Sequence, residues 1–440
     1  MSVMPAVTSS SSSFEGEAKA PATAFEMVDV LGLAQLVKRS GDLDGSVPLR
    51  VAQGCGPLFE GNSFGFQISL RQCITLCRTD RGVGMEIDEP YGEALAVSHR
   101  AVLPRLVARG LLAPDGLLST AFADDFVRVE RNDAGDVRVR LWTGLLVRAD
   151  AGVWLRVSAT ANRRNRFLEV EEQFIADGAL VPLVLNITLR PDAPDRVRLE
   201  GEIGTLAPVA PGARIADVPL VEAPEIGAAH AAFYDEAYFE AKTGGPTRKY
   251  RKMKPPDSPQ SEAPARCRVI NIGPAAHTIT GSIARVVFTN LVPFEACFDG
   301  YTITVQSDQR VLRAGAREVE RAFAEALGPT FLGKNRHAVW FFTKYFTCHL
   351  PGEPHFFVKP WALVQTPPGW SCLLEGVHGD GFDVLRGIVA TDIFHTTPAV
   401  FHVFRTGEPI RVGLGEPLLQ VMPIPRWLLQ AGFRQGTFCG

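Results

Sequence analysis

Alternating apolar and polar residues recur in short runs along most of the chain. Such alternation is typical of antiparallel strands, and the runs are separated by turn sequences rich in Gly, Pro and Asp. The predicted strands include 126–130 and 137–147 in the first half, and 338–347 and 355–364 in the second half. The pattern therefore predicts antiparallel sheets arranged as a β-sandwich or a partly closed barrel.

Two segments instead have the spacing of an amphipathic helix. In residues 316–327 the apolar side chains recur on one helical face, and the Gly328-Pro329 pair predicts the end of the helix. In the first half the pattern predicts a helix over 91–112, kinked at Pro104. Each half thus combines a helix with several strands, and the predicted fold class is α+β, mostly β.

An ordered set of short motifs occurs twice in the chain. The matched segments are Gly152–Val157 with Gly369–Leu374, Phe174–Asp177 with Ile388–Asp392, Pro182–Thr188 with Pro398–Phe404, and Gly201–Glu202 with Gly415–Glu416. Their common order predicts two similar units in tandem, an N-terminal unit over 50–212 and a C-terminal unit over 267–428. Chance similarity between strand-rich segments is the alternative.

The segments outside these units differ in composition. Residues 1–24 contain a run of five serines and neither the basic nor the apolar part of a secretory signal. We therefore expect a disordered tail and a cytoplasmic protein. Residues 213–266 combine a predicted helix at 230–241 with a basic, proline-rich stretch that favours a flexible linker.

Charge and hydropathy argue against two classes of partner. The 440 residues include 45 Lys and Arg against 48 Asp and Glu, a net charge of −3, so no overall field attracts nucleic acid. The longest apolar stretches, such as 181–185, are far shorter than the about 20 residues that a membrane helix needs. We expect a small-molecule substrate as the partner, and formation of a homo-oligomer stays open.

The end of the C-terminal unit contains a series of motifs: Thr366–Trp370, Gly387–Asp392, Gly415–Pro417 and Pro423–Arg426. This PPGW…GIVxTD…GEP…PxPR series resembles the C-terminal signature of an uncharacterised bacterial domain-of-unknown-function family, over roughly residues 338–427. The resemblance implies no established activity. Where that pattern has Asn this chain has His402, whereas the first half has Asn186.

Part of the same region is also similar to the trimeric dUTPase-type fold. The similarity lies in Gly387–Asp392 and Gly415–Gln420. The chain lacks the Ser- and Gly-rich phosphate motifs of that family, so this likeness implies no nucleotide chemistry here.

Histidine is concentrated in the second half, where six of nine histidines lie between positions 337 and 402. Imidazole is the commonest metal ligand and titrates near neutral pH. His378 and Asp380 form a His-x-Asp element in a Gly-rich loop, and His402 lies on a later predicted strand. Two histidines and one carboxylate are the ligand set of non-haem iron oxygenases. We therefore expect these three residues to bind a divalent metal, with Fe(II) as the predicted cofactor.

The six histidines are not expected to converge on one point. A turn separates His349 from His355, and the alternation of strand side chains then directs the two rings to opposite faces. Hydrogen-bonded or exposed histidines without a metal are the alternative.

Aromatic residues are concentrated in the same half. Interpreted as a strand, residues 340–346 place aromatic side chains on both faces. We expect Phe341, Trp370 and Phe401 to shape an apolar substrate pocket, the usual form of a small-molecule site. A purely structural aromatic core is the alternative.

These observations lead to two functional hypotheses. The first is an enzyme for a small organic molecule, with metal-dependent oxidation in the C-terminal unit and a degenerate N-terminal unit. The second is a non-catalytic ligand-binding or protein-interaction module built from tandem β units. The concentration of histidine and aromatic residues in one half favours the first.

Overall fold

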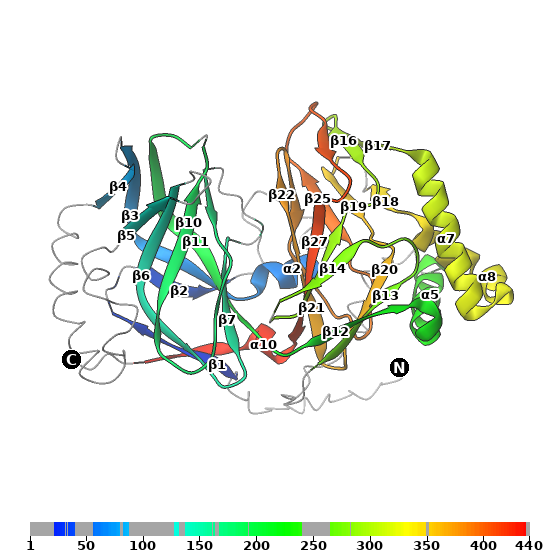
Figure 1. The fold of residues 1–440 in the computed structure, drawn as a ribbon, viewed down its shortest axis with the longest axis horizontal. Helices are drawn as coiled ribbons and strands as arrows, with labels where there is room; N and C mark the ends of the chain where they lie inside the picture. Colours follow the sequence, from blue (N-terminus) through cyan, green and yellow to red (C-terminus); the bar gives the residue numbers. More distant parts are fainter. Residues whose placement is uncertain are drawn as a thin grey trace, which may run out of the picture.

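The structure is a computed structural model that describes residues 22–30, 32, 34–39, 56–79, 82–87, 127–131, 137–160, 162, 167–191, 193–239, 265–281, 283–348 and 352–436. In this part of the chain the fold is mostly β, with open and largely antiparallel sheets. The strands form two groups that lie side by side (Figure 1). This arrangement confirms the predicted fold class. No helix among the described residues has the length and apolar character needed to cross a membrane.

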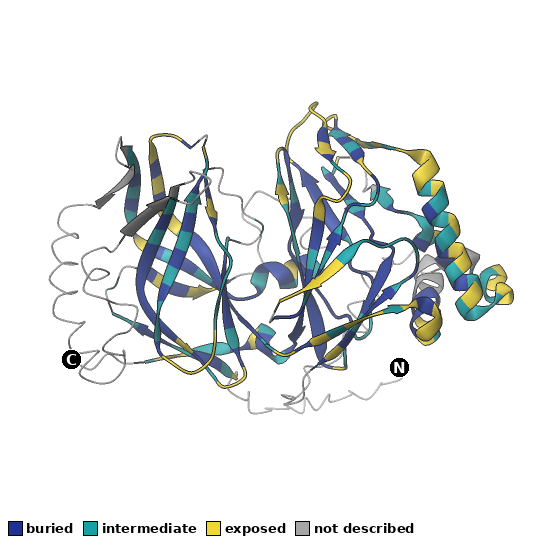
Figure 2. Cartoon of the chain, in the orientation of Figure 1, coloured by how far each residue is buried: buried dark blue, intermediate teal, exposed yellow. Residues whose placement is uncertain are grey.

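The first unit consists of two open sheets. Its strands are β1 Thr23–Asp29, β2 Ala34–Lys38, β3 Phe66–Thr79, β4 Gly82–Ile87, β5 Val127–Arg131, β6 Val137–Ala149, β7 Trp154–Ser158, β8 Leu168–Val170, β9 Gln173–Ile175, β10 Val181–Leu189, β11 Arg196–Val209 and β28 Gly432–Gln435. One sheet has the order β28-β1-β6-β10-β8, with β5 on β6, and the other has the order β2-β3-β11-β7-β9, with β4 on β3. Apolar side chains of both sheets, including Phe25, Trp142 and Leu206, form one buried core. Figure 2 shows that much of the length of these strands is buried.

The second unit contains four smaller sheets. Its strands are β12 Arg214–Pro219, β13 Arg266–Asn271, β14 His277–Thr280, β15 Arg285–Thr289, β16 Phe294–Phe298, β17 Ile303–Ser307, β18 Phe346–Cys348, β19 His355–Val358, β20 Ala362–Gln365, β21 Trp370–Gly376, β22 His378–Gly379, β23 Phe382–Leu385, β24 Gly387–Val389, β25 Ala399–Val403, β26 Ile410–Val412 and β27 Pro417–Pro425. The sheet orders are β12-β13-β20, β14-β15-β27-β21-β24, β17-β16-β26 and β18-β19-β25-β23-β22. Their apolar side chains meet in a second core that includes Phe288, Phe356 and Phe401.

Helices flank the second unit. The helical segments are α2 Gly56–Ser63, the 3-10 turn η1 Leu220–Glu222, α5 Pro224–Phe239, α7 Gln309–Leu327, α8 Pro329–Lys334, α9 Arg336–Thr343 and α10 Trp427–Gln430. Helices α5, α7 and α8 lie on the side of the second unit remote from the first (Figure 1). Asp308 caps α7 by accepting a hydrogen bond from the backbone N of Arg310, and Gly328 ends the helix with φ of 82°. The predicted end of the 316–327 helix is confirmed.

The prediction of a strand over 338–347 is wrong. Residues Arg336–Thr343 form α9, and β18 begins only after it. Phe342 of α9 is buried, and its ring stacks on Phe323 of α7 with 5.3 Å between the centroids. Packing against α7 therefore overrides the strand propensity of these aromatic residues. The expected strand over 355–364 is divided into β19 and β20.

Segments beyond the predicted unit boundaries also join the sheets. β1 begins within the expected tail, and β1, β2 and β28 all belong to sheets of the first unit although they lie outside 50–212. β12 lies in the segment expected to be a helix and linker, and it pairs in parallel with β13. Helix α5 is close to the predicted 230–241 helix. The predicted 91–112 helix and the proline-rich linker lie outside the described residues.

The two units share a sheet topology. The orders β2-β3-β11-β7-β9 and β14-β15-β27-β21-β24 correspond strand by strand, and all neighbours in both are antiparallel. The backbone N–H of Gly152, before β7, donates to Asp177 Oδ2 at 2.9 Å. The backbone N–H of Gly369, before β21, donates to Asp392 Oδ2 at 3.1 Å. The repeat predicted from the motifs thus has a counterpart in topology and in hydrogen bonding.

An apolar interface joins the two units. Phe64 of the first unit packs with Leu373 and Met422 of the second in one buried cluster. Helix α2 lies against β24, between the units (Figure 1). At this crossing a Cβ atom on Gly61 would be 2.5 Å from the Cα atom of Gly387. The close approach of the two backbones therefore requires glycine at position 61.

Candidate functional site

The three predicted metal ligands lie on the β18-β19-β25-β23-β22 sheet and its turns, but the structure does not bring them together. Their partners are Asp383 for His378, Arg405 for Asp380 and His355 for His402. No group of three or more His, Cys, Asp or Glu side chains that could hold a metal occurs among the described residues. The exposed side chain of Asp380 pairs with Arg405.

A different set of four side chains is aligned across this sheet. His402 of β25 lies between two opposite residues, His355 of β19 on one side and Asp383 of β23 on the other. Asp383 is in turn opposite His378 of β22. Opposite residues of antiparallel strands have side chains on the same face. We call these four residues the histidine row. Its hydrogen bonds join His402 Nδ1 to His355 Nε2 at 2.9 Å and His378 Nδ1 to Asp383 Oδ1 at 2.8 Å.

A tight hairpin turn positions the outer half of the histidine row. Asp380 and Gly381 form the two-residue turn between β22 and β23, and Gly381 has φ of 90°. Asp-Gly is favoured in such turns because glycine adopts a positive φ without strain. This turn places His378 directly opposite Asp383. It leaves Asp380 at the tip of the hairpin, away from the row.

The histidine row extends from the interior of the sheet to its edge. His355 is fully buried, His402 is 9% exposed, and the side chain of His378 is 37% exposed. The opposite face of the same strands carries Phe356 and Phe401, whose rings stack at 4.8 Å. The aromatic core therefore supports the strands from one face, and the row occupies the other face.

The two halves of the row differ in their electrostatics. Burial lowers the pKa of His402, and the nearby Asp383 carboxylate opposes this shift. Two neutral imidazoles satisfy the bond between His402 and His355, since one ring donates an N–H and the other accepts it. At the edge, the Asp383 carboxylate favours a proton on Nδ1 of His378. Nε2 of His378 is then available as a proton acceptor.

Two other histidines are buried away from the row. His230 Nε2 is hydrogen-bonded to the hydroxyl of Thr396, and His395 Nδ1 lies 2.8 Å from the backbone O of Thr391. Burial lowers the pKa of both imidazoles. They are the hydrogen-bonded core histidines of the alternative interpretation, whereas His349 lies outside the described residues.

The three aromatic residues expected to shape a substrate pocket are packing residues. Phe401 is fully buried in the core and lies on the face opposite the histidine row. Trp370 belongs to a separate buried cluster with Cys267. Phe341 on α9 is partly buried and has Lys359 Nζ 3.6 Å from its ring centroid. Because strand alternation and the α9 helix separate them, the structure does not bring these three side chains to the row.

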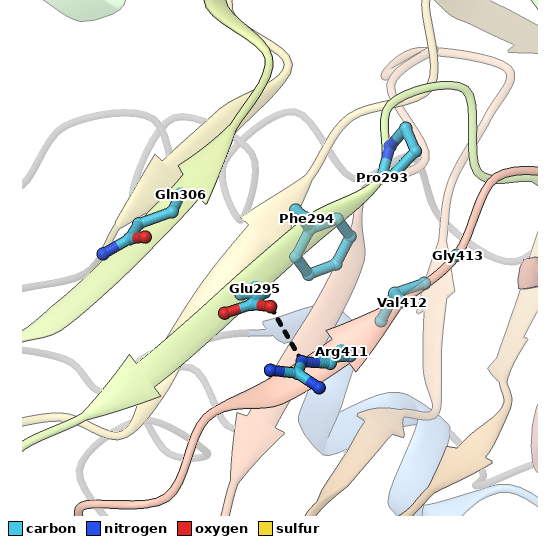
Figure 3. Close-up of a pocket in the computed structure, with 7 residues that line it drawn as sticks. All are labelled: Pro293, Phe294, Glu295, Gln306, Arg411, Val412 and Gly413. Carbon is cyan, nitrogen blue, oxygen red and sulfur yellow. Dashed lines mark hydrogen bonds and ion pairs between the residues drawn. The ribbon is translucent and has the colours of Figure 1, made fainter.

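A shallow pocket of about 280 Å³ opens on the β17-β16-β26 sheet (Figure 3). Glu295 lies between Gln306 and Arg411 in the strand register, and Arg411 Nε donates to Glu295 Oε1 at 2.7 Å. Phe294 also lines the pocket, and its ring contacts Phe401 at 5.7 Å. The pocket is therefore on the aromatic side of the sheet that carries the row, away from His378.

The metal ligands predicted from the sequence include His378 and His402 of the row but not their partners, Asp383 and His355. A signal for Asp383 exists in the sequence, because the Asp380-Gly381 pair predicts the hairpin turn that places Asp383 opposite His378. The pairing of His355 with His402 has no local signal, since these residues are 47 positions apart and meet only through the register of β19 and β25.

Comparison with known proteins identifies no family for this chain. No family model matches it, and no curated protein sequence matches it. Among solved structures, the 2'-deoxycytidine 5'-triphosphate deaminase from Agrobacterium tumefaciens is similar at 10% sequence identity and a TM-score of 0.28. The alignment covers 91% of this chain and 99% of that chain. At this TM-score the likeness supports no statement about this protein.

Proposed function

We propose that this protein is an enzyme that acts on a small polar molecule by acid–base catalysis at the edge of the histidine row. The observation that carries the proposal is the 2.8 Å bond from His378 Nδ1 to Asp383 Oδ1 at a partly exposed position of the second unit. In this proposal Nε2 of His378 accepts a proton from the substrate. Asp383 is a positioning residue that holds the imidazole in one tautomer.

The chemistry of these groups supports the proposal. Imidazole changes its charge near neutral pH, so it both takes and returns a proton under physiological conditions. A carboxylate on one ring nitrogen stabilises the imidazolium that forms when the other nitrogen accepts a proton. His402 lies opposite Asp383 on the neighbouring strand, and His355 lies opposite His402. The described residues of the first unit, by contrast, include no histidine.

A divalent metal such as Fe(II) does not fit the row as it stands. The Nδ1 atoms of His378 and His402 are engaged by Asp383 and His355, and the described residues offer no group of three ligands. Elemental analysis of protein purified without chelator tests the metal-dependent oxidation separately. Stoichiometric iron in the wild type that is lost in His402→Ala would replace the acid–base proposal by a metal-dependent one.

The test is a turnover screen of the full chain against small-molecule substrates of hydrolases, lyases and isomerases. For any substrate turned over, His378→Gln should lower kcat by about 10²–10⁴-fold, the usual contribution of a general base. Asp383→Asn should lower kcat with little change in KM and shift the pH profile, because it acts through the orientation and charge of His378.

A second histidine–aspartate pair provides the matched control. His277 Nε2 lies 3.3 Å from Asp217 Oδ2, outside the histidine row. His277→Gln should leave kcat and KM unchanged. Turnover that survives His378→Gln would place the catalytic site elsewhere. An absence of turnover across the whole panel would favour the non-catalytic binding module.

A further inference from the structure

A cluster of buried charges lies where the two units meet. From the first unit come Arg39, after β2, Arg156 of β7 and Glu202 of β11. From the second unit come Glu375 of β21 and Arg386, between β23 and β24. The side chains of all five residues are at most 18% exposed. The cluster lies beside the apolar interface, because the Arg386 guanidinium carbon is 5.5 Å from the centroid of the Phe64 ring.

Most of these charges have good partners. Arg39 is ion-paired with Glu202, and Arg156 is ion-paired with both Glu375 and Glu172. These carboxylates raise the pKa of Arg156 although burial alone would lower it. The pKa of Glu375 is likewise lowered by its arginine neighbours, against the effect of its burial. Arg39 and Arg156 are therefore compensated.

Arg386 is the exception in the cluster. Its side chain is only 4% exposed, and among the described residues the carboxylate that it contacts is Glu375, whose Oε1 lies 3.3 Å from Nε. None of its three guanidinium nitrogens has a hydrogen-bond partner in the described part of the chain. Its backbone, by contrast, is held firmly, because Asn162 Oδ1 accepts from Arg386 N at 2.6 Å and Asn162 Nδ2 donates to Arg386 O at 3.2 Å.

The charge balance around Arg386 is positive. Among the described residues whose charges act on it, Arg39 and Arg156 are opposed by Glu202 and Glu375. These four charges cancel. Glu172, the second partner of Arg156, is also ion-paired with Arg285, so that pair cancels too and the guanidinium of Arg386 is left over. Burial lowers the pKa of Arg386 to about 10, so the group is still charged at neutral pH. A buried charge without compensation is strongly destabilising, and proteins usually pair such charges.

We propose that the interface between the two units binds one small oxyanion, a phosphate or a carboxylate, through the Nη1 and Nη2 atoms of Arg386. Glu375 lies at Nε, which leaves the two terminal nitrogens for the ligand. Their fork matches two oxygen atoms of a phosphate or a carboxylate. Since the cluster contains side chains of both units, the bound anion links them.

The experiment measures binding of inorganic phosphate and of acetate to the full chain by calorimetric titration and by thermal unfolding at constant ionic strength. Saturable binding of one anion per chain is expected, with a rise in Tm of about 2 °C at a large excess over Kd. The anion that saturates distinguishes a phosphate site from a carboxylate site. Phosphate also stabilises proteins non-specifically, so only a saturable rise counts.

Arg386→Met is the decisive variant. It should abolish saturable binding without lowering the Tm in the absence of anion, because it replaces an uncompensated buried charge by an apolar side chain of similar length. The exposed Arg434→Met is the matched control and should keep the binding. If Arg386→Met fails to fold, Arg386→Lys should weaken binding at least tenfold, since lysine lacks the fork.

Two outcomes would overturn the proposal. The first is an absence of saturable binding of either anion to the wild type, which would mean that water and Glu375 satisfy Arg386. The second is binding that persists in both Arg386 variants, which would place the anion elsewhere.

Discussion

The two units share a hydrogen bond between a glycine N–H and an aspartate, in very different surroundings. In the first unit Asp177 accepts the backbone N–H of Gly152 at an exposed position. In the second unit Asp392 accepts the equivalent N–H of Gly369. It also accepts two hydrogen bonds of 2.7 Å from the guanidinium of Arg426. The side chains of Arg426 and Asp392 are 0% and 5% exposed. The shared topology therefore preserves the backbone contact, while burial decides how much the carboxylate contributes to stability.

The corresponding strands β10 and β25 differ in the same way. Asn186 of β10 is opposite Arg140 of β6, whereas His402 of β25 is opposite His355 of β19. The motif alignment places Asn186 and His402 at the same position of the repeat. The second unit thus has a pair of imidazoles where the first has an amide opposite a guanidinium. The two units therefore share a strand order but differ in the side chains at this pair of opposite positions.

The comparison predicts the largest effect at the two aspartates. Asp392→Ala leaves the guanidinium of Arg426 buried and unpaired, and should lower the free energy of unfolding by about 3–5 kcal/mol. Asp177→Ala removes one hydrogen bond at the surface and should cost about 1 kcal/mol. Urea unfolding of both variants measures the difference. Equal losses would show that the shared glycine–aspartate hydrogen bond, and not the buried ion pair, determines the effect.

Contact between the units is tested at a pair of helical glycines. Gly61→Ala directs a Cβ atom into the backbone of Gly387, so we expect a loss of about 1–3 kcal/mol in the free energy of unfolding. Gly333 on α8 has nothing within 4 Å of its Cβ position. Gly333→Ala should therefore stabilise the protein by about 0.5–1 kcal/mol. A neutral Gly61→Ala variant would show that α2 and β24 can separate at low cost.

Acid should destabilise the second unit before the first. Burial lowers the pKa of His230, His395 and His402 in the folded state. In the unfolded chain these histidines bind a proton below about pH 6.5. In the folded state they bind it only at a lower pH, because their pKa is lowered. Stability is therefore complete above this pH and is lost as the pH falls through it, by up to about 1.4 kcal/mol per pH unit for each histidine.

The measurement is the slope of the free energy of unfolding against pH between 7.5 and 5, together with limited proteolysis at the lower pH. His395→Gln should reduce this slope by the contribution of one proton. Cleavage should appear first within the second unit. Earlier cleavage within the first unit would contradict the comparison.

The smallest effect is expected when the second unit is given the residue of the first. His402→Asn keeps a polar side chain opposite His355 and should change the free energy of unfolding at pH 7.5 by less than about 1 kcal/mol. Because it removes the ring-to-ring bond, the 15N signals of His355 should change. NMR spectra that detect the imidazole nitrogens measure this change. Unchanged signals would mean that the two rings do not interact in solution.

Part of the candidate site is readable from local sequence. The Asp380-Gly381 turn places His378 opposite Asp383 without reference to any distant residue, and Gly328 ends α7 where the sequence predicts. A run of aromatic residues favours a strand locally, so the sequence predicts a strand around Phe342 where the structure has helix α9. This helix depends on the stacking of Phe342 on Phe323, which no local pattern contains.

By itself the sequence determined the strand-rich fold class and turns such as Asp380-Gly381, because these depend on residues close together in the chain. Only the tertiary structure decided that His402 meets His355, that Asp392 meets Arg426, and that Arg386 is buried between the units. These contacts depend on strand register and on packing between segments far apart in the chain. Register and packing are set by the whole core, so each local motif acquires its partner only when the sheets assemble.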